Sequence, residues 1–395
     1  MTAPPAESID RGRIWFAQAL RGLAAALVVW GHLGDVFFTS HPLMAARVLV
    51  LPLHHVERPP WEDFIDRVFA YHGINTGSLG IALFFLVSGF VIPFSLERGT
   101  LAQFFARRFF RLYPTLWVCL TIVAVALAIW AADRGTSYPY GSGEFLANGS
   151  LINIYTRHRS LLFVEWTLAI EELFYLLAAL LAWKRRLASP VAILGLGAVL
   201  TVISATVGHG LTQSSGSYDL RYWLSRNTAF VIFILVGTAL HNAYRKGWPA
   251  RVTVPVVVSL LIMFDIAIHE GSLIANPEFA YFENALFALM IFAVLLTLNE
   301  RLPRPRALNW MADVSYPLYL VHATLGTIVA YAVYEETRSI YVTVLTAIGA
   351  SYVVAWLVHR FVEQPSIALG RRVSERLGRR ERPADDFAPS LSRKG

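Results

Sequence analysis

The chain has 395 residues, of which 56% are hydrophobic and only 15% are charged, whereas ordinary soluble domains are roughly one quarter charged. Apolar stretches recur from residue 15 to residue 362 with short interruptions, which excludes a set of soluble domains joined by polar linkers. The single cysteine, Cys119, excludes a disulfide framework. The net charge of +7 has a topological explanation, given below, so we expect no nucleic-acid partner.

Ten apolar stretches approach the length of about 20 residues that a helix needs to cross a bilayer. They cover residues 15–33, 79–96, 115–132, 166–183, 191–208, 223–244, 252–269, 279–298, 311–333 and 340–362. The first is not expected to be a cleavable signal peptide, because it is long, contains Arg21 and precedes no small-residue cleavage site. The sequence therefore predicts an all-α, polytopic transmembrane bundle of about ten helices.

Lys and Arg gather in every second loop of this arrangement, and in both termini. The clusters include Arg98, Arg107, Arg108 and Arg111, then Lys184, Arg185 and Arg186, then Arg245, Lys246 and Arg251, and then Arg301, Arg304 and Arg306. The intervening loops hold only scattered cations, so the asymmetry predicts that both termini are cytoplasmic. We expect an N-terminal segment at 1–14, a transmembrane domain at 15–366 and a basic, disordered cytoplasmic tail at 367–395.

Two polar residues in the first helix are the strongest candidates for function, because charges inside spanning segments are costly. Arg21 lies near the predicted cytoplasmic side, and His32 closes the same helix at its outer end. Eleven residues place them roughly 16 Å apart along the axis. Asp35 follows His32 by three positions, so a continuing helix would let its carboxylate hold the imidazole.

Further polar residues lie inside the fourth and ninth predicted helices. The fourth helix enters the membrane from the outer side, which predicts that Glu171 and Glu172 lie at a depth similar to that of His32. His322 lies near the middle of the ninth helix, where Pro317 predicts a kink.

Two other patterns predict contacts between helices or with a ligand. In the second helix, the pair Ser88-Gly89 permits close approach of a neighbouring helix. Arg108 and Arg111, one turn apart before the third helix, have the spacing needed to grip a phosphate or pyrophosphate.

Each candidate also has a purely structural interpretation. Arg108 and Arg111 suit positive-inside anchors equally well, His322 suits a hydrogen-bonded core histidine, and Glu171 suits a counter-charge for a buried arginine. A set of external polar residues superficially imitates a metal site, but their spacing matches no standard motif and we expect no metal. They are His54, His55, Glu57, Asp63 and His72.

Six motifs in chain order resemble the acyltransferase 3 family, the bacterial membrane O-acyltransferases that include O-antigen and nodulation-factor acetylases. The resemblance covers residues from about 14 to 366. It is carried by Arg21-Gly22-Leu23-Ala24 with His32, by Leu83 to Phe90, by Arg108-x-x-Arg111-x-x-Pro114, by Trp166 to Tyr175, by Ser315 to Leu320 with His322, and by Phe361 to Pro365. Gln364 and Thr167 depart from the more usual Arg and Ser.

The resemblance implies a cytoplasmic acyl-CoA co-substrate, most often acetyl-CoA, and a glycan or lipid-linked saccharide acceptor on the other side. We expect Arg108 and Arg111 to bind the CoA and Arg21 to contact the donor. His32, oriented by Asp35 or Glu171, would act as general base or carry the acyl group. The candidates for acceptor binding are Asp35, Glu172 and His322, together with acidic and aromatic residues near the outer ends of the helices. These acidic and aromatic residues are Trp166, Tyr222, Trp223, Glu278, Tyr281 and Glu283.

Two other functional classes stay open. A transporter or flippase of lipid-linked sugars would also use ten helices and buried charges, but it needs no CoA site and commonly shows two repeated halves, which this sequence lacks. A membrane sensor or scaffold would leave Arg21 and His32 without a role.

Overall fold

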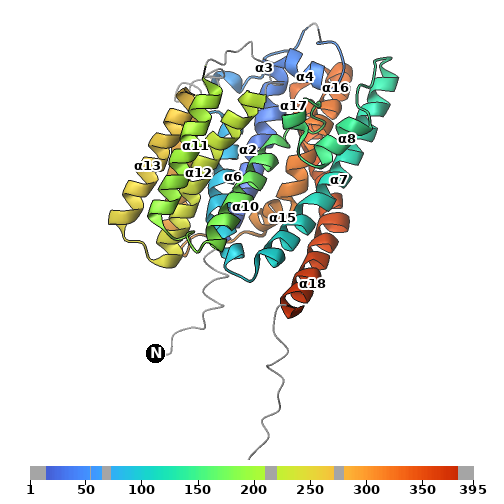
Figure 1. Ribbon diagram of the computed structural model, residues 1–395. Coiled ribbons are helices and arrows are strands. Elements are labelled where there is room, and N and C mark those ends of the chain that lie inside the picture. The colour runs from blue at the N-terminus through green and yellow to red at the C-terminus, as the bar shows by residue number, and fades with distance from the viewer. Residues whose placement is uncertain (1–14, 54, 65–72, 210–219, 271–279, 381–395) are drawn as a thin grey trace, which may run out of the picture.

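The computed structural model describes residues 15–53, 55–64, 73–209, 220–270 and 280–380, and this part of the chain is built from helices (Figure 1). The long helices, in chain order, are α2 (Trp15–Trp30), α6 (Thr76–Leu96), α7 (Leu101–Asp133), α10 (Trp166–Trp183), α11 (Pro190–Gly208), α12 (Leu220–Lys246), α13 (Ala250–His269), α14 (Tyr281–Leu298), α15 (Arg306–Val321), α16 (Thr324–Thr337), α17 (Ile340–Val358) and α18 (Gln364–Arg380). The short elements are η1 (Gly31–Val36), α3 (Phe37–Thr39), α4 (His41–Arg47), α8 (Ser142–Gly149), α9 (Asn153–Thr156) and η6 (His359–Glu363).

In the described residues, nine helical stretches are long and apolar enough to cross a membrane, and the bent pair α15–α16 makes up to ten. This confirms the predicted all-α class and the helix count. The outer surfaces of several helices expose large apolar side chains, as lipid-facing surfaces do. Examples are Val199, Val202, Ile262 and Leu345. The protein is a multi-pass membrane protein.

The bundle is organised around α12, whose residues from Ser225 to Asn242 are almost all buried. Gly89 of α6 and Gly237 of α12 allow these two helices to cross closely, because a Cβ on Gly89 would overlap the Ile234 carbonyl oxygen. The predicted close approach at Ser88-Gly89 is thereby confirmed.

Three predicted boundaries were wrong. The third helix begins at Leu101 rather than 115, because Thr100 and Gln103 form a capping box, so the arginine pair lies within α7. The ninth predicted helix is broken into α15 and α16, whose axes are bent by 76° between Val321 and Thr324. Pro317 lies inside α15 without breaking it. The polar tail continues as α18 to Arg380, and residues 381–395 lie outside the described residues.

The helix α18 is ordered because it packs on α7. The amide of Gln103 donates a hydrogen bond to the Ser374 carbonyl at 2.8 Å, and Arg107 donates one to the Ser374 hydroxyl at 2.7 Å. Gly370 lies against the Phe110 ring. The segment was predicted to be disordered because its sequence is polar, but one face of α18 is buried.

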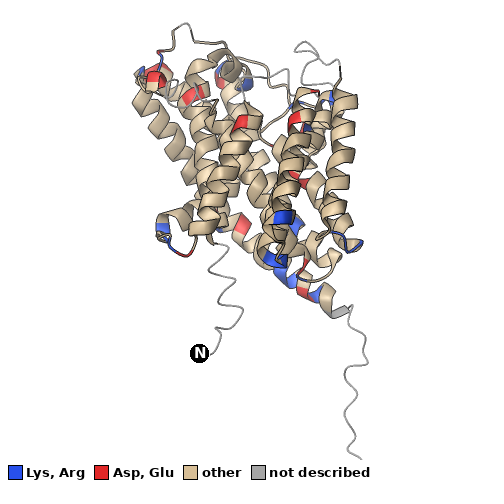
Figure 2. Ribbon diagram, turned by 90° about the vertical axis from the view of Figure 1, so that its left-hand side faces the viewer, with Lys and Arg blue, Asp and Glu red and all other residues tan. Residues whose placement is uncertain are grey.

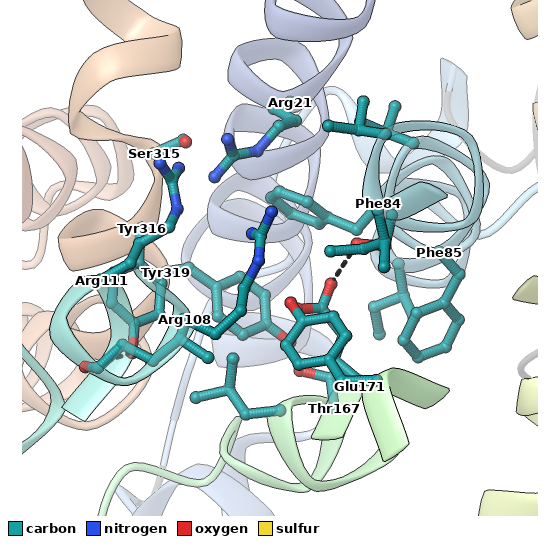
Figure 3. Close-up of a pocket in the computed structure, with 18 residues that line it drawn as sticks. Arg21, Phe84, Phe85, Arg108, Arg111, Thr167, Glu171, Ser315, Tyr316 and Tyr319 are labelled. Carbon is teal, nitrogen blue, oxygen red and sulfur yellow. Dashed lines mark hydrogen bonds between the residues drawn. The ribbon is translucent and has the colours of Figure 1, made fainter. Parts of the chain in front are cut away.

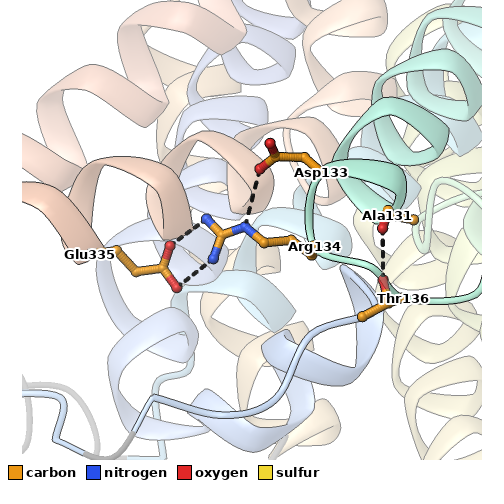
Figure 4. Close-up of polar contacts among 5 residues, drawn as sticks. All are labelled: Ala131, Asp133, Arg134, Thr136 and Glu335. Carbon is orange, nitrogen blue, oxygen red and sulfur yellow. Dashed lines mark hydrogen bonds and ion pairs between the residues drawn. The ribbon is translucent and has the colours of Figure 1, made fainter.

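The two ends of the bundle differ. Figure 1 shows α3, α4 and α8 at one end, with the end of α18 at the other, and Figure 2 shows many of the Lys and Arg residues near the α18 end. At the α4 end, Arg134 after α7 forms a two-pronged ion pair with Glu335 of α16 and contacts Asp133 at 3.5 Å (Figure 4). This pair ties α7 to the second half of the broken span.

Candidate active site

Three guanidinium groups converge in a cavity of about 80 Å³ in the interior of the bundle, here called the arginine cavity. Arg21 comes from α2, and Arg108 and Arg111 come from α7 (Figure 3). The cavity is otherwise lined by aromatic and aliphatic side chains from α6, α10 and α15. The sequence had suggested Arg108 and Arg111 as one site and Arg21 as another, and the structure brings all three together.

Glu171 supplies the carboxylate of the arginine cavity. It accepts hydrogen bonds from the Ser88 hydroxyl and, at 2.8 Å, from the Tyr175 hydroxyl (Figure 3). Glu171 was predicted to lie at a depth similar to that of His32, but it lines the arginine cavity with Arg21, whereas Trp166, five residues earlier in α10, lines the cavity that contains His32. Glu172 lines neither described cavity and accepts a hydrogen bond from Tyr113.

A second and larger cavity, of about 370 Å³, lies toward the α4 end and is here called the histidine cavity. His32 and Asp35 line it from η1. Trp166, Tyr222, Trp223 and Tyr281, four of the six residues predicted for an acceptor cleft, line it as well. Of the other two, Glu283 packs against Gly73, and Glu278 lies outside the described residues.

His32 is hydrogen-bonded to His322, which lies 290 positions later in the chain. The distance from Nδ1 of His32 to Nε2 of His322 is 2.9 Å. On the far side of its ring, Nδ1 of His322 lies 3.1 Å from the Leu318 carbonyl and 2.9 Å from the Tyr319 carbonyl.

The backbone determines how protons are arranged in this pair. A carbonyl oxygen only accepts, so Nδ1 of His322 carries a hydrogen, and Nε2 of a neutral His322 is an acceptor. Nδ1 of His32 must therefore donate, which leaves the lone pair of a neutral His32 on Nε2. That is the arrangement a general base requires.

Asp35 was predicted to orient the imidazole of His32, but Nδ1 of His32 is hydrogen-bonded to His322 instead. The chain forms a π-helical turn over Gly31–Val36, which changes the α-helical register that would align residues three apart. The Thr39 hydroxyl donates to the Asp35 carboxylate at 3.0 Å.

The two cavities adjoin each other at Ile81 and Tyr319, which line both. The Tyr319 hydroxyl lies 2.9 Å from the Thr167 hydroxyl, and the Tyr319 ring meets Phe84 edge-on. Ile81 and Tyr319 therefore lie at the boundary where the arginine-lined and histidine-lined spaces meet.

Two arginines that the sequence did not mark as functional also belong to this site. Arg226 of α12 and Arg47 of α4 both line the histidine cavity. Arg226 lies inside a predicted span, and that position should have marked it as functional. As to metals, no group of three or more suitable side chains occurs among the described residues; His54 and His72 lie outside them.

Comparison with known proteins agrees with this architecture. A family model described as an acyltransferase domain matches residues 14–360. Peptidoglycan O-acetyltransferase OatA of Listeria monocytogenes is 26% identical over 346 residues, which cover 76% of this chain and 54% of OatA. Nodulation protein 10 of Rhizobium leguminosarum is 25% identical over 268 residues, covering 62% of this chain and 70% of that protein.

Acyltransferase MdmB of Streptomyces mycarofaciens is 26% identical over 383 residues, covering 88% of this chain and 95% of MdmB. The chain thus spans about half the length of OatA but nearly all of MdmB. No solved structure matches the chain. With a family model that covers most of the bundle and both cavities, the protein belongs to the acyltransferase 3 family of membrane acyltransferases.

Proposed function

We propose that the protein transfers an acyl group, most simply acetyl, from cytoplasmic acyl-CoA to a hydroxyl of a cell-surface or lipid-linked glycan. The observation that carries this proposal is the His32–His322 pair, which leaves Nε2 as the basic nitrogen of His32 in a residue that lines one cavity, next to a second cavity with three converging arginines. OatA, a relative by sequence, is named as an O-acetyltransferase of peptidoglycan.

In this proposal the acyl end of the donor enters the arginine cavity. Arg108 and Arg111 attract the anionic CoA, and Arg21 donates hydrogen bonds to the thioester carbonyl as negative charge develops on its oxygen. Glu171 limits the net positive charge of the cavity and, with its bonds to Ser88 and Tyr175, stays fixed.

The acceptor enters the histidine cavity, where Trp166 offers a sugar-stacking surface. Nε2 of His32 takes the proton of the acceptor hydroxyl, the hydroxyl oxygen attacks the thioester carbonyl carbon, the C–S bond breaks, and the CoA thiolate leaves and takes up a proton. A covalent route, in which Nε2 of His32 first carries the acyl group, uses the same geometry.

We further propose that the protein lies in the inner membrane of a bacterial cell, as the family resemblance implies, with both termini in the cytoplasm, as the Lys and Arg clusters predict. The arginine cavity then lies on the donor side and the histidine cavity on the acceptor side.

The decisive experiment measures free CoA released by purified protein in nanodiscs, given acetyl-CoA and a glycan extract from the producing cell. Acceptor-dependent release is expected, and His32→Ala should lower it about 10²–10⁴-fold. His269→Ala is the matched control, since His269 is exposed at the end of α13 and bonds its own helix. A folded His32→Ala protein with normal turnover refutes the catalytic role, and no release with any donor favours the transporter instead.

A further inference from the structure

Arg226 is held in the wall of the histidine cavity by aromatic groups. The residue is only 8% exposed, and its guanidinium carbon lies 3.6 Å from the ring centroid of Trp166. It donates to the hydroxyls of Tyr222 at 3.4 Å and Tyr281 at 3.3 Å, both neutral groups, and its Nε is buried without an acceptor. This cation is pre-positioned and still has unused donor capacity.

Arg47 reaches the same cavity from α4. Its Nε and Nη1 are buried and have no hydrogen-bond acceptor, and its guanidinium lies over the Phe163 ring. Burial lowers the pKa of Arg47 to about 9, against the opposing effect of Glu165, so the group remains protonated at neutral pH. Two separate elements thus bring arginine donors without acceptors to one cavity.

The acids of the cavity do not account for these donors. Glu165 accepts hydrogen bonds at Oε1 from Ser160 at 2.6 Å and from Asn153 at 3.2 Å, and burial raises the pKa of its carboxyl. Among the described residues that line the cavity, the acids Asp35 and Glu165 stand against three arginines, the third being Arg157. A buried arginine donor without an acceptor is costly, so a ligand that accepts from it is favoured.

We propose that the histidine cavity recognises an acceptor that carries an oxyanion, a carboxylate or a phosphate group. Arg226 and Arg47 bind the oxyanion, the aromatic wall stacks on the sugar, and a neighbouring hydroxyl faces His32. This inference rests on the proposed acyl transfer, because it names the chemical class of the acceptor. The oxyanion comes either from an acidic sugar or from the diphosphate of a lipid carrier.

Two matched pairs of probes separate these sources. Calorimetric titration of the full-length protein in nanodiscs compares methyl glucuronoside with methyl glucoside, and farnesyl diphosphate with farnesol. We expect the anionic member of at least one pair to bind tenfold or more tightly than its neutral counterpart, and the pair that shows this preference identifies the source.

Variants test whether the two arginines cause the preference. Arg226→Gln should reduce it to less than twofold, Arg47→Gln should weaken it, and Arg226→Lys should keep part of it because the charge remains. Arg245→Gln, exposed at the other end of α12, should leave it unchanged. Comparable binding of the neutral probes by wild type and Arg226→Gln shows that the variant is folded.

The outcomes distinguish this inference from the proposed function. Equal binding of anionic and neutral probes by the wild type overturns the inference, as does a preference that survives in both Arg226→Gln and Arg47→Gln. Anion preference without CoA release refutes acyl transfer and leaves the anion site standing. CoA release with acceptors that are all neutral refutes the anion site and leaves acyl transfer standing.

Discussion

The imidazole of His322 forms hydrogen bonds through both of its nitrogens. Its Nδ1 donates to the Leu318 and Tyr319 carbonyls at the end of α15, of which the Leu318 carbonyl also accepts from the His322 backbone, and its Nε2 accepts from His32. The side chain that stabilises the break in the span therefore also selects the tautomer of the proposed base. His322 is a positioning residue in this scheme, since it reaches the acceptor only through His32.

Replacing His322 should impair turnover more than binding. His322→Ala removes the acceptor of Nδ1 of His32 and no longer fixes its tautomer, so kcat should fall about 10-fold or more while the KM of each substrate changes little. His322→Gln should restore part of the rate, because an amide can accept from His32 and donate to a carbonyl. A uniform loss of activity and of folded protein in both variants would indicate a structural role alone.

Arg108 and Arg111 should act on the donor. The double variant Arg108→Gln with Arg111→Gln should raise the KM of acyl-CoA at least tenfold and leave the KM of the acceptor unchanged, because only the donor side loses charge-assisted hydrogen bonds. Steady-state kinetics with each substrate varied in turn measures this. An unchanged affinity for acyl-CoA would remove both residues from the donor site.

The sequence predicted some residues of the site but not the contacts between them. Arg21 and His32 could be singled out because polar side chains are costly in a spanning helix. The partner of His32 could not, because it depends on a break after Val321 that brings together positions 290 residues apart. Arg226 was overlooked because it lies near the end of its predicted helix, where arginine is also a common anchor.

At the scale of elements, irregular helical segments position the two histidines of the site. The π-helical turn at Gly31–Val36 follows directly on α2 and carries His32, and the 76° bend after Val321 positions His322. Regular periodicity predicts where helices lie but not where they are interrupted, which explains why the number of spans was predicted and this geometry was not.

The crossing of α6 and α12 offers a test of packing. Gly89→Ala should lower the free energy of unfolding by about 1–3 kcal/mol, because the added methyl group overlaps the Ile234 carbonyl oxygen. Gly195→Ala in α11 is the control: a Cβ there meets nothing within 4 Å, and alanine favours the helix by up to about 1 kcal/mol. Thermal unfolding in detergent compares them, and equal melting temperatures would contradict the close crossing.

For the whole molecule, the asymmetry of Lys and Arg predicts an orientation that can be tested with thiol chemistry. The native Cys119 is fully buried, so the chain offers little background labelling. In intact cells, a membrane-impermeant maleimide should label Ser142→Cys, in the exposed region at α8, and should label Arg186→Cys, between α10 and α11, only after permeabilisation. The opposite pattern would invert the proposed orientation and exchange the sides of donor and acceptor.

The boundary at Ile81 and Tyr319 has a consequence for proton balance. If the thioester occupies the arginine cavity and the acceptor the histidine cavity, the acceptor proton is released on one side of Tyr319 and the thiolate appears on the other. Either that proton passes inward with every ester formed and turnover is electrically silent, or each turnover leaves one proton outside and consumes one inside. In the proposed reaction, the side chains at this boundary thus determine whether acyl transfer contributes to the proton-motive force.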